Sequence, residues 1–252
     1  IYLPEDEAGR AQYAELQERL AALKGEDANG RYGRLATQTA LTRQEDWEWG
    51  WKQYFKPFPV GRRFLIKPSW ETVEDVQGRQ ILEIDPASSF GTGSHDTTQL
   101  CMAALEEAVH PGDSLLDMGT GSGILAIAAA MLGAEVRTIV DIDENCLKTA
   151  QENAEKNHVS VGRGLCGDAL RDPALAEEIG GGYNIIVANI VADVIIGMAP
   201  MFADKLVSGG TLICSGILNE RADEVRAALT DAGFTVENHA HSEDWSAFIA
   251  CL

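Results

Sequence analysis

The chain has 252 residues, of which 45% are hydrophobic and 23% charged, which is enough for one large domain or for a catalytic domain with a smaller appendage. Its net charge of −19 disfavours free DNA or RNA as a substrate and favours a basic partner, although solubility alone would also explain it. No apolar run approaches the roughly 20 residues of a membrane span, and no signal peptide opens the chain, so we expect a cytoplasmic protein with no membrane contact. The five widely spaced cysteines indicate neither a disulfide framework nor a zinc site.

Residues 1–46 are expected to form an incomplete N-terminal domain, because the chain begins without methionine and its natural start is expected upstream. Apolar residues at helical spacing from Glu7 to Lys24 predict an amphipathic helix packed on a small sheet. Residues 47–58 hold three of the five tryptophans among charged residues and are interpreted as an aromatic-rich linker. Its aromatic side chains either line a substrate cleft or pack against the larger domain.

Residues 59–252 are expected to form the larger domain, which begins with two strand-like runs, a stretch of small residues and a helix over Thr98–Val109. From Ser114 onward, apolar strands alternate with helices. The expected strands are 114–118, 136–142, 164–168, 184–190, 211–216, 234–240 and 245–251, and the expected helices are 122–132, 144–157, 192–206 and 219–231. This alternation predicts a doubly wound, mostly parallel, Rossmann-like α/β sheet of seven strands, with an antiparallel hairpin closing one edge.

The strongest functional signal is the run Leu-Leu-Asp-Met-Gly-Thr-Gly-Ser-Gly at residues 115–123, where an apolar strand enters a glycine turn. Gly119 and Gly121 allow the backbone to approach a ligand closely. The spacing is G-x-G-x-G, whereas a dinucleotide fingerprint needs a glycine at the position of Ile124. The spacing therefore favours S-adenosylmethionine, which has no phosphate, over NAD. A tight turn that binds no ligand is the remaining alternative.

Three polar residues follow apolar runs at the predicted carboxyl ends of strands, where ligands of such sheets bind. Asp141 is placed to accept hydrogen bonds from both hydroxyls of a ribose. Asp168 is placed to accept one from the adenine amino group, or else it is an ordinary turn or capping residue. Asn189 is placed to accept a hydrogen bond from a substrate amine and to aim its lone pair at a methyl group, or else it caps the next helix.

Five segments carry a resemblance to a known family. They are Asp-Pro-Ala-Ser-Ser-Phe-Gly-Thr-Gly-Ser-His-Asp-Thr-Thr at 85–98, Leu-Asp-Met-Gly-Thr-Gly-Ser-Gly-Ile-Leu-Ala-Ile-Ala at 116–128, Asp-Ile-Asp at 141–143, Ala-Asn-Ile-Val-Ala-Asp at 188–193 and Ser-Gly-Gly-Thr-Leu-Ile-Cys-Ser-Gly-Ile-Leu at 208–218. With these segments, the chain resembles the PrmA family of class I methyltransferases, which trimethylate amino groups of ribosomal protein L11.

The resemblance implies that the chain transfers methyl groups from S-adenosylmethionine to lysine side chains and the N-terminal amine of ribosomal protein L11. It also implies that the N-terminal domain recognises this substrate. The cofactor contacts it implies are Thr98, Gly119, Asp141 and Asn189, with a lid over the methionine part formed by Phe90, Gly91, Thr92 and Gly93.

Three other interpretations stay open at this point. A related protein-lysine or small-molecule N-methyltransferase shares every cofactor feature and differs only in its acceptor. An NAD-dependent oxidoreductase fits the sheet but not the glycine spacing, and a noncatalytic module would bind the cofactor without turnover. His95 is a minor candidate for a base, because a lone histidine in a loop of small residues more often has a structural role.

Overall fold

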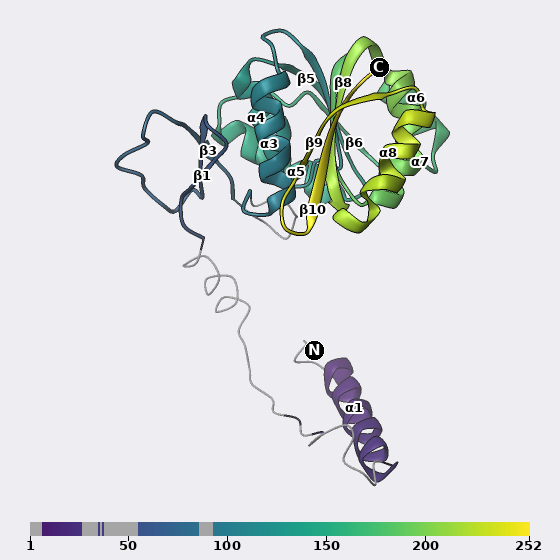
Figure 1. The fold of residues 1–252 in the computed structure, drawn as a ribbon. Coiled ribbons are helices and arrows are strands. Elements are labelled where there is room, and N and C mark those ends of the chain that lie inside the picture. Colours follow the sequence, from purple (N-terminus) through teal and green to yellow (C-terminus); the bar gives the residue numbers. More distant parts are fainter. Residues whose placement is uncertain (1–6, 27–34, 36, 38–54, 86–92) are drawn as a thin grey trace. The chain divides into compact units, whose positions relative to one another are not determined.

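The computed structural model describes residues 7–26, 35, 37, 55–85 and 93–252. The chain divides into two compact units, Ile1–Tyr54 and Phe55–Leu252 (Figure 1). In the first unit, helix α1 spans Glu7–Glu26, close to the helix expected from the apolar spacing. The sheet expected beside it and residues 47–54 of the expected linker lie outside the described residues, so the domain assignments of these segments stay predictions.

The second unit is built on a seven-stranded sheet with the order β6-β5-β4-β7-β8-β10-β9. Neighbouring strands are parallel except that β10 runs antiparallel to β8 and β9, which confirms the doubly wound sheet and its closing hairpin. The strands are β4 (Ser114–Met118), β5 (Glu135–Asp141), β6 (Arg163–Cys166), β7 (Tyr183–Asn189), β8 (Leu206–Leu218), β9 (Thr235–His241) and β10 (Trp245–Cys251).

Helices cover both faces of this sheet (Figure 1). One face carries α3 (Asp96–Ala108), α4 (Ile124–Leu132) and α5 (Glu144–Lys156), and the other carries α6 (Pro173–Ile179), α7 (Ala192–Lys205) and α8 (Ala222–Asp231). Because side chains alternate along a strand, Leu115 of β4 packs into one core and Leu116 into the other. None of the described helices is both long and apolar enough to cross a membrane.

Several element boundaries differ from the sequence-based expectation, the largest shift being in β8, which begins at Leu206 rather than at residue 211. Helix α3 begins at Asp96 rather than Thr98, because the His95 side chain caps it by accepting a hydrogen bond from the Thr97 amide. The expected helix 219–231 opens with a 3₁₀ turn, η2, at Asn219–Arg221. Strand β1 and helix α6 were not expected, because they have only 3 and 7 residues and so show little periodicity.

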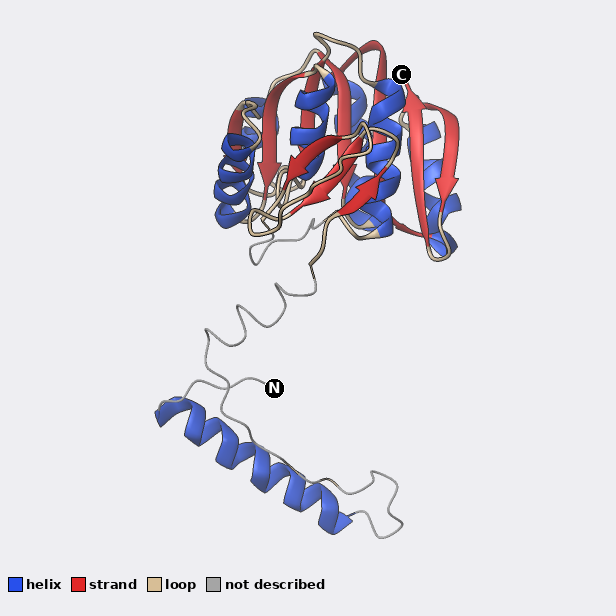
Figure 2. Cartoon of the chain, turned by 90° about the vertical axis from the view of Figure 1, so that its left-hand side faces the viewer, coloured by secondary structure: helices blue, strands red, loops and turns tan. Residues whose placement is uncertain are grey.

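A small three-stranded sheet packs against α3 on the first face of the main sheet, and Figure 2 shows it toward the viewer. Strand β1 (Phe58–Val60) pairs antiparallel with β2 (Phe64–Lys67), which pairs parallel with β3 (Gln80–Glu83). Phe55 packs near Trp70, which belongs to the larger domain, with ring centroids 6.5 Å apart. At this described end of the expected linker, the aromatic side chain therefore packs against the domain.

Polar side chains near the end of α5 form hydrogen bonds and an ion pair with β3 and the residues that follow it. The Asn157 amide accepts a hydrogen bond from the Glu83 backbone N–H at 2.8 Å and donates one to the Glu83 carbonyl at 2.7 Å. Lys156 Nζ lies 2.6 Å from Asp85 Oδ2, just before the segment 86–92 that lies outside the described residues. The small sheet is thus held by side-chain hydrogen bonds in addition to its apolar core.

Asn153, also in α5, forms hydrogen bonds both to Asp85 and to the glycine turn. Its Oδ1 accepts a hydrogen bond from the Asp85 backbone N–H at 3.2 Å, and its Nδ2 donates one to the Ser122 carbonyl at 3.0 Å. Asn153 is 1% exposed, so water does not readily replace its hydrogen bond to the buried Ser122 carbonyl if the amide is removed.

We expect Asn153→Ala to lower the free energy of unfolding by about 1–3 kcal/mol, because the buried Ser122 carbonyl and the half-buried Asp85 N–H lose these hydrogen bonds. Urea denaturation monitored by circular dichroism measures the change. Asn145→Ala, at the exposed start of the same helix, is the matched control and should cost less than about 1 kcal/mol. Equal losses in the two variants would contradict the role assigned to Asn153.

Candidate functional site

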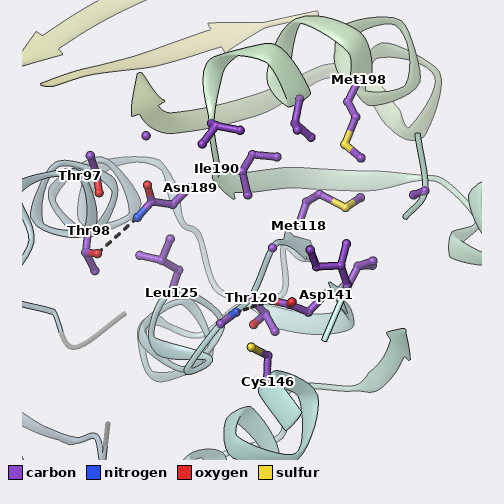
Figure 3. A pocket seen from close by; sticks show the side chains of 18 of the residues that line it. Thr97, Thr98, Met118, Thr120, Leu125, Asp141, Cys146, Asn189, Ile190 and Met198 are labelled. Carbon is purple, nitrogen blue, oxygen red and sulfur yellow. Dashed lines mark hydrogen bonds between the residues drawn. The ribbon is translucent and has the colours of Figure 1, made fainter. Parts of the chain in front are cut away.

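A cavity of about 580 Å³ lies at the carboxyl ends of the parallel strands, where the strand order reverses between β4 and β7. Its size and place are typical of a small-molecule site in a doubly wound sheet. Six residues predicted from the sequence line this one cavity, and some of them are labelled in Figure 3: Thr98, Gly119, Gly121, Asp141, Asp168 and Asn189.

The backbone of the glycine turn packs closely against neighbouring residues at two of its glycines. Gly119 has a φ of +76°, and a Cβ added there would lie 2.3 Å from Ile190 Cγ2. At Gly123, with a φ of +82°, an added Cβ would lie 2.7 Å from the Cβ of Ala150 in α5. Both positions therefore require glycine for the packing of the chain itself, apart from any need of a ligand.

Asp141 is anchored to the glycine turn. Its Oδ2 accepts a hydrogen bond from the Gly121 backbone N–H at 2.9 Å, and its Oδ1 accepts one from the Asp143 N–H at 3.0 Å. The Cys146 side chain also hydrogen-bonds to this carboxylate. Since each carboxylate oxygen has two acceptor positions, the carboxylate still keeps acceptor capacity for a ligand in the cavity. A carboxylate held in this way fits a pair of ribose hydroxyls, as S-adenosylmethionine presents.

Asn189 lies at the end of β7 and has one unused polar atom. Its Nδ2 donates to Thr98 Oγ1 at 3.3 Å, as the dashed line in Figure 3 shows. Its Oδ1 is buried and has no hydrogen-bond partner within the described residues. The helix-capping alternative does not hold, because α7 has Val191 at its N-cap and no side-chain capping bond. A buried acceptor without a partner costs about 1–3 kcal/mol, which a donor group on a ligand would recover.

The remaining predicted residues differ in how they lie relative to the cavity. Asp168 lines the cavity, but it also accepts a hydrogen bond from the Leu170 N–H at 3.0 Å, as the turn alternative expects. Gly93 is buried and faces Ile124, a residue that lines the cavity. Phe90, Gly91 and Thr92 lie outside the described residues, so the predicted lid stays a prediction.

His95 has the structural role that the sequence favours. Its Nδ1 accepts a hydrogen bond from the Thr97 backbone N–H at 3.3 Å, and its ring meets Trp245 at a steep angle, with ring centroids 5.1 Å apart. Within the parts of the chain that the structure describes, no group of three or more histidine, cysteine or acidic side chains is arranged to hold a metal ion.

Two residues of this region were not singled out by the sequence. Asp117 of β4 is fully buried, and its Oδ2 accepts a hydrogen bond from Thr120 Oγ1 at 2.7 Å. Burial raises the pKa of Asp117 to about 7, against the opposing effect of the Thr120 hydrogen bond. Trp245 lines the cavity from the start of β10. Its place there depends on the strand order, which no local pattern reveals.

Known proteins are similar to this chain over most of its length. The model of the family "Ribosomal protein L11 methyltransferase (PrmA)" matches residues 6–251. A ribosomal protein L11 methyltransferase of Pelotomaculum thermopropionicum is 41% identical over 252 residues, which is 100% of this chain and 78% of that protein. One of Heliobacterium modesticaldum is 42% identical over 240 residues, covering 93% of this chain and 74% of the relative.

A solved structure of a protein with the same kind of name has a similar fold. The crystal structure of a ribosomal protein L11 methylase from Lactobacillus delbrueckii subsp. bulgaricus matches with a TM-score of 0.70 and 30% identity, over 78% of this chain and 97% of that one.

The chain belongs to the ribosomal protein L11 methyltransferase (PrmA) family. It is therefore an S-adenosylmethionine-dependent methyltransferase, as the glycine spacing and the resemblance predicted. Two alternatives, an NAD-dependent oxidoreductase and a noncatalytic module, do not agree with this membership. The groups in the cavity fit this cofactor, because the Asp141 carboxylate keeps acceptor capacity for the ribose hydroxyls beside the glycine turn.

The raised pKa of Asp117 predicts a pH-dependent stability. The folded protein holds the Asp117 proton more tightly than the unfolded chain, so this group stabilises the fold below about pH 4 and loses that contribution as the pH rises through about 7. Asparagine does not titrate in this range. We therefore expect the difference in free energy of unfolding between Asp117→Asn and wild type to shift in favour of the variant by up to about 4 kcal/mol from pH 4 to pH 8. Urea denaturation of both proteins across this range measures it, and a constant difference would contradict the assignment.

Proposed function

We propose that this methyltransferase modifies amino groups of ribosomal protein L11, both lysine side chains and the N-terminal amine, in the cytoplasm. The observation that carries the proposal is the Asn189 carbonyl oxygen, which is buried in the wall of the cavity without a hydrogen-bond donor within the described residues. An amine is a donor that this oxygen lacks. The relatives at 41% and 42% identity are named for the same acceptor protein.

In this proposal, one half of the cavity holds the cofactor. Asp141 would accept hydrogen bonds from the ribose hydroxyls, while Gly119 and Gly121 would let the backbone approach the methionine part. Asp168 would meet the adenine from the end of β6, and Thr98 would face the cofactor from the first turn of α3. When bound, S-adenosylmethionine supplies an electrophilic methyl group on a sulfonium.

Asn189 would position the acceptor. Because Thr98 Oγ1 accepts from the amide nitrogen, the amide is oriented with its oxygen available to the incoming amine. An amine that donates one hydrogen to this oxygen has its lone pair directed elsewhere, which suits an in-line transfer. Holding two reacting atoms in place supplies up to roughly 7–11 kcal/mol of barrier reduction in the best intramolecular models.

The cavity wall helps the amine to lose its proton. Apolar side chains make up much of the lining, including Met118, Leu125, Ile190 and Met198 (Figure 3). An apolar site lowers the pKa of an amine, because desolvation disfavours the ammonium form. The proposal therefore needs no strong general base, which agrees with the structural role of His95.

The charge of the chain supports a basic acceptor protein. With a net charge of −19, long-range electrostatics would speed the approach of a basic protein and oppose that of free nucleic acid. Charge alone does not name the acceptor, and a related N-methyltransferase with another acceptor would have the same cofactor contacts.

The cofactor half is tested by Asp141→Ala. We expect the dissociation constant for S-adenosylmethionine, measured by isothermal titration calorimetry, to rise about 10- to 100-fold, because hydrogen bonds to a charged group contribute about 1.5–3 kcal/mol. Asp143→Asn is the matched control, since it lies two residues away and asparagine also caps helices well. Unchanged binding in Asp141→Ala would remove this carboxylate from the proposed site.

The acceptor half is tested with purified, unmethylated ribosomal protein L11 and labelled S-adenosylmethionine, with the product read by mass spectrometry. We expect wild type to methylate L11 and Asn189→Ala to lower kcat at least 100-fold, with Asn145→Ala unchanged. If wild type binds the cofactor but leaves L11 unlabelled, the acceptor is a different molecule. Full activity in Asn189→Ala would show that its carbonyl does not position the amine.

A further inference from the structure

The cavity extends beyond Asn189 along the edge of the sheet. Its lining residues follow the strand order, from Asp141 at the end of β5 through Gly119 after β4 and Asn189 at the end of β7 to Gly216 in β8 and Trp245 in β10. Because β10 runs antiparallel to β8, its first residue lies at the edge where β8 ends, with Trp245 opposite Leu218. Apart from Thr98 in α3, the cofactor contacts of the proposed function lie at the ends of β5, β6 and β4.

We propose that Trp245 forms the acceptor end of this cavity and binds the side chain of the lysine that is to be methylated, delivered by a basic protein. The inference rests on the proposed function, which places the transfer at Asn189. The indole would contact the aliphatic stem of the lysine, and its face would attract the ammonium group before the amine reaches Asn189. Trp245 is therefore a binding residue for the acceptor and has no role toward the cofactor.

Contacts in the structure connect Trp245 with the transfer site. The Trp245 ring packs on His95, with centroids 5.1 Å apart, and His95 caps α3. One helical turn further along, Thr98 accepts the hydrogen bond that orients the Asn189 amide. Trp245 and Asn189 therefore both contact the first turn of α3 and line the same cavity.

The turn that presents Trp245 is held in place before any ligand binds. Asn219 donates side-chain hydrogen bonds to the carbonyls of Ser242 and Glu243, at 3.2 and 2.9 Å, and its backbone N–H donates to the Asp244 carbonyl at 2.9 Å. The Asn219 Oδ1 in turn accepts from Ser246 Oγ at 2.7 Å. Backbone on both sides of Trp245 is thus fixed, which reduces the entropy lost on binding.

The surface next to this turn carries charge of the sign that a lysine-bearing segment needs. Glu220, Glu243 and Asp244 are exposed, and none of them has an ion pair within the described residues. By contrast, Arg221 pairs with Asp193 at 2.7 Å and with Glu224 at 2.7 Å. The three unpaired carboxylates at the Trp245 end would attract a basic segment and favour its approach to the cavity.

The first test measures steady-state kinetics with ribosomal protein L11 as the varied substrate. We expect Trp245→Ala to raise KM for L11 about tenfold. Trp245→Phe should keep KM close to the wild-type value, since phenylalanine keeps an aromatic face. The dissociation constant for S-adenosylmethionine should stay within about twofold of wild type, which also shows that the variant is folded. Trp70→Phe and Trp70→Ala, at a half-buried tryptophan outside the cavity lining, should match wild type.

The second test reverses the charge. We expect the double variant Glu243→Lys with Asp244→Lys to raise KM for L11 and to flatten its salt dependence, while Glu177→Lys with Glu178→Lys makes the same charge change on α6 with a smaller effect. Equal effects of the two pairs would overturn the local part of the proposal.

The outcomes separate this inference from the proposed function. A wild-type enzyme that leaves L11 unmethylated overturns both. A wild-type enzyme that methylates L11, with an unchanged KM in Trp245→Ala, overturns only the role of Trp245. A loss of cofactor affinity as large as the rise in KM for L11 would place Trp245 on the cofactor side and would also overturn the inference.

Discussion

The hydrogen bond from the Gly121 N–H to the Asp141 carboxylate is the interaction on which the site depends. It joins the turn after β4 to the end of β5, so that one carboxylate both shapes the glycine turn and faces the cavity. The turn has little room for alternatives, because Gly119 lies against Ile190 and Gly123 lies against Ala150. A site made from backbone atoms in this way keeps its shape without a ligand, which reduces the cost of binding.

Unsatisfied polar atoms concentrate at the same edge of the sheet. Within the described residues, three buried side-chain atoms have no hydrogen-bond partner: Asp117 Oδ1, Asn189 Oδ1 and Ser242 Oγ. Asp117 precedes the glycine turn, Asn189 ends β7, and Ser242 belongs to the turn that presents Trp245. Of these three residues, Asn189 lines the cavity, and folded proteins rarely keep such an atom unless it serves a function.

Much of the architecture could be predicted because its signals are local. Strands buried on both faces give continuous apolar runs, and helices between them give 3.6-residue periodicity, so the alternation identified the doubly wound sheet. The ends of parallel strands meet at one edge, which is why Gly119, Asp141 and Asn189 could be grouped in advance. Short elements such as β1 and α6 were not predicted, because they are too short to show a periodic pattern of apolar residues.

The sequence by itself determined the sheet, the glycine turn and the family, because each is carried by residues close together in the chain. Only the tertiary structure decided that Thr98, 91 positions before Asn189, hydrogen-bonds to its amide, and that Trp245 lines the same cavity. These contacts depend on α3 packing beside β7 and on β10 inserting next to β8. The pKa of Asp117 was likewise undetermined until its complete burial was known, because desolvation is a property of the whole fold.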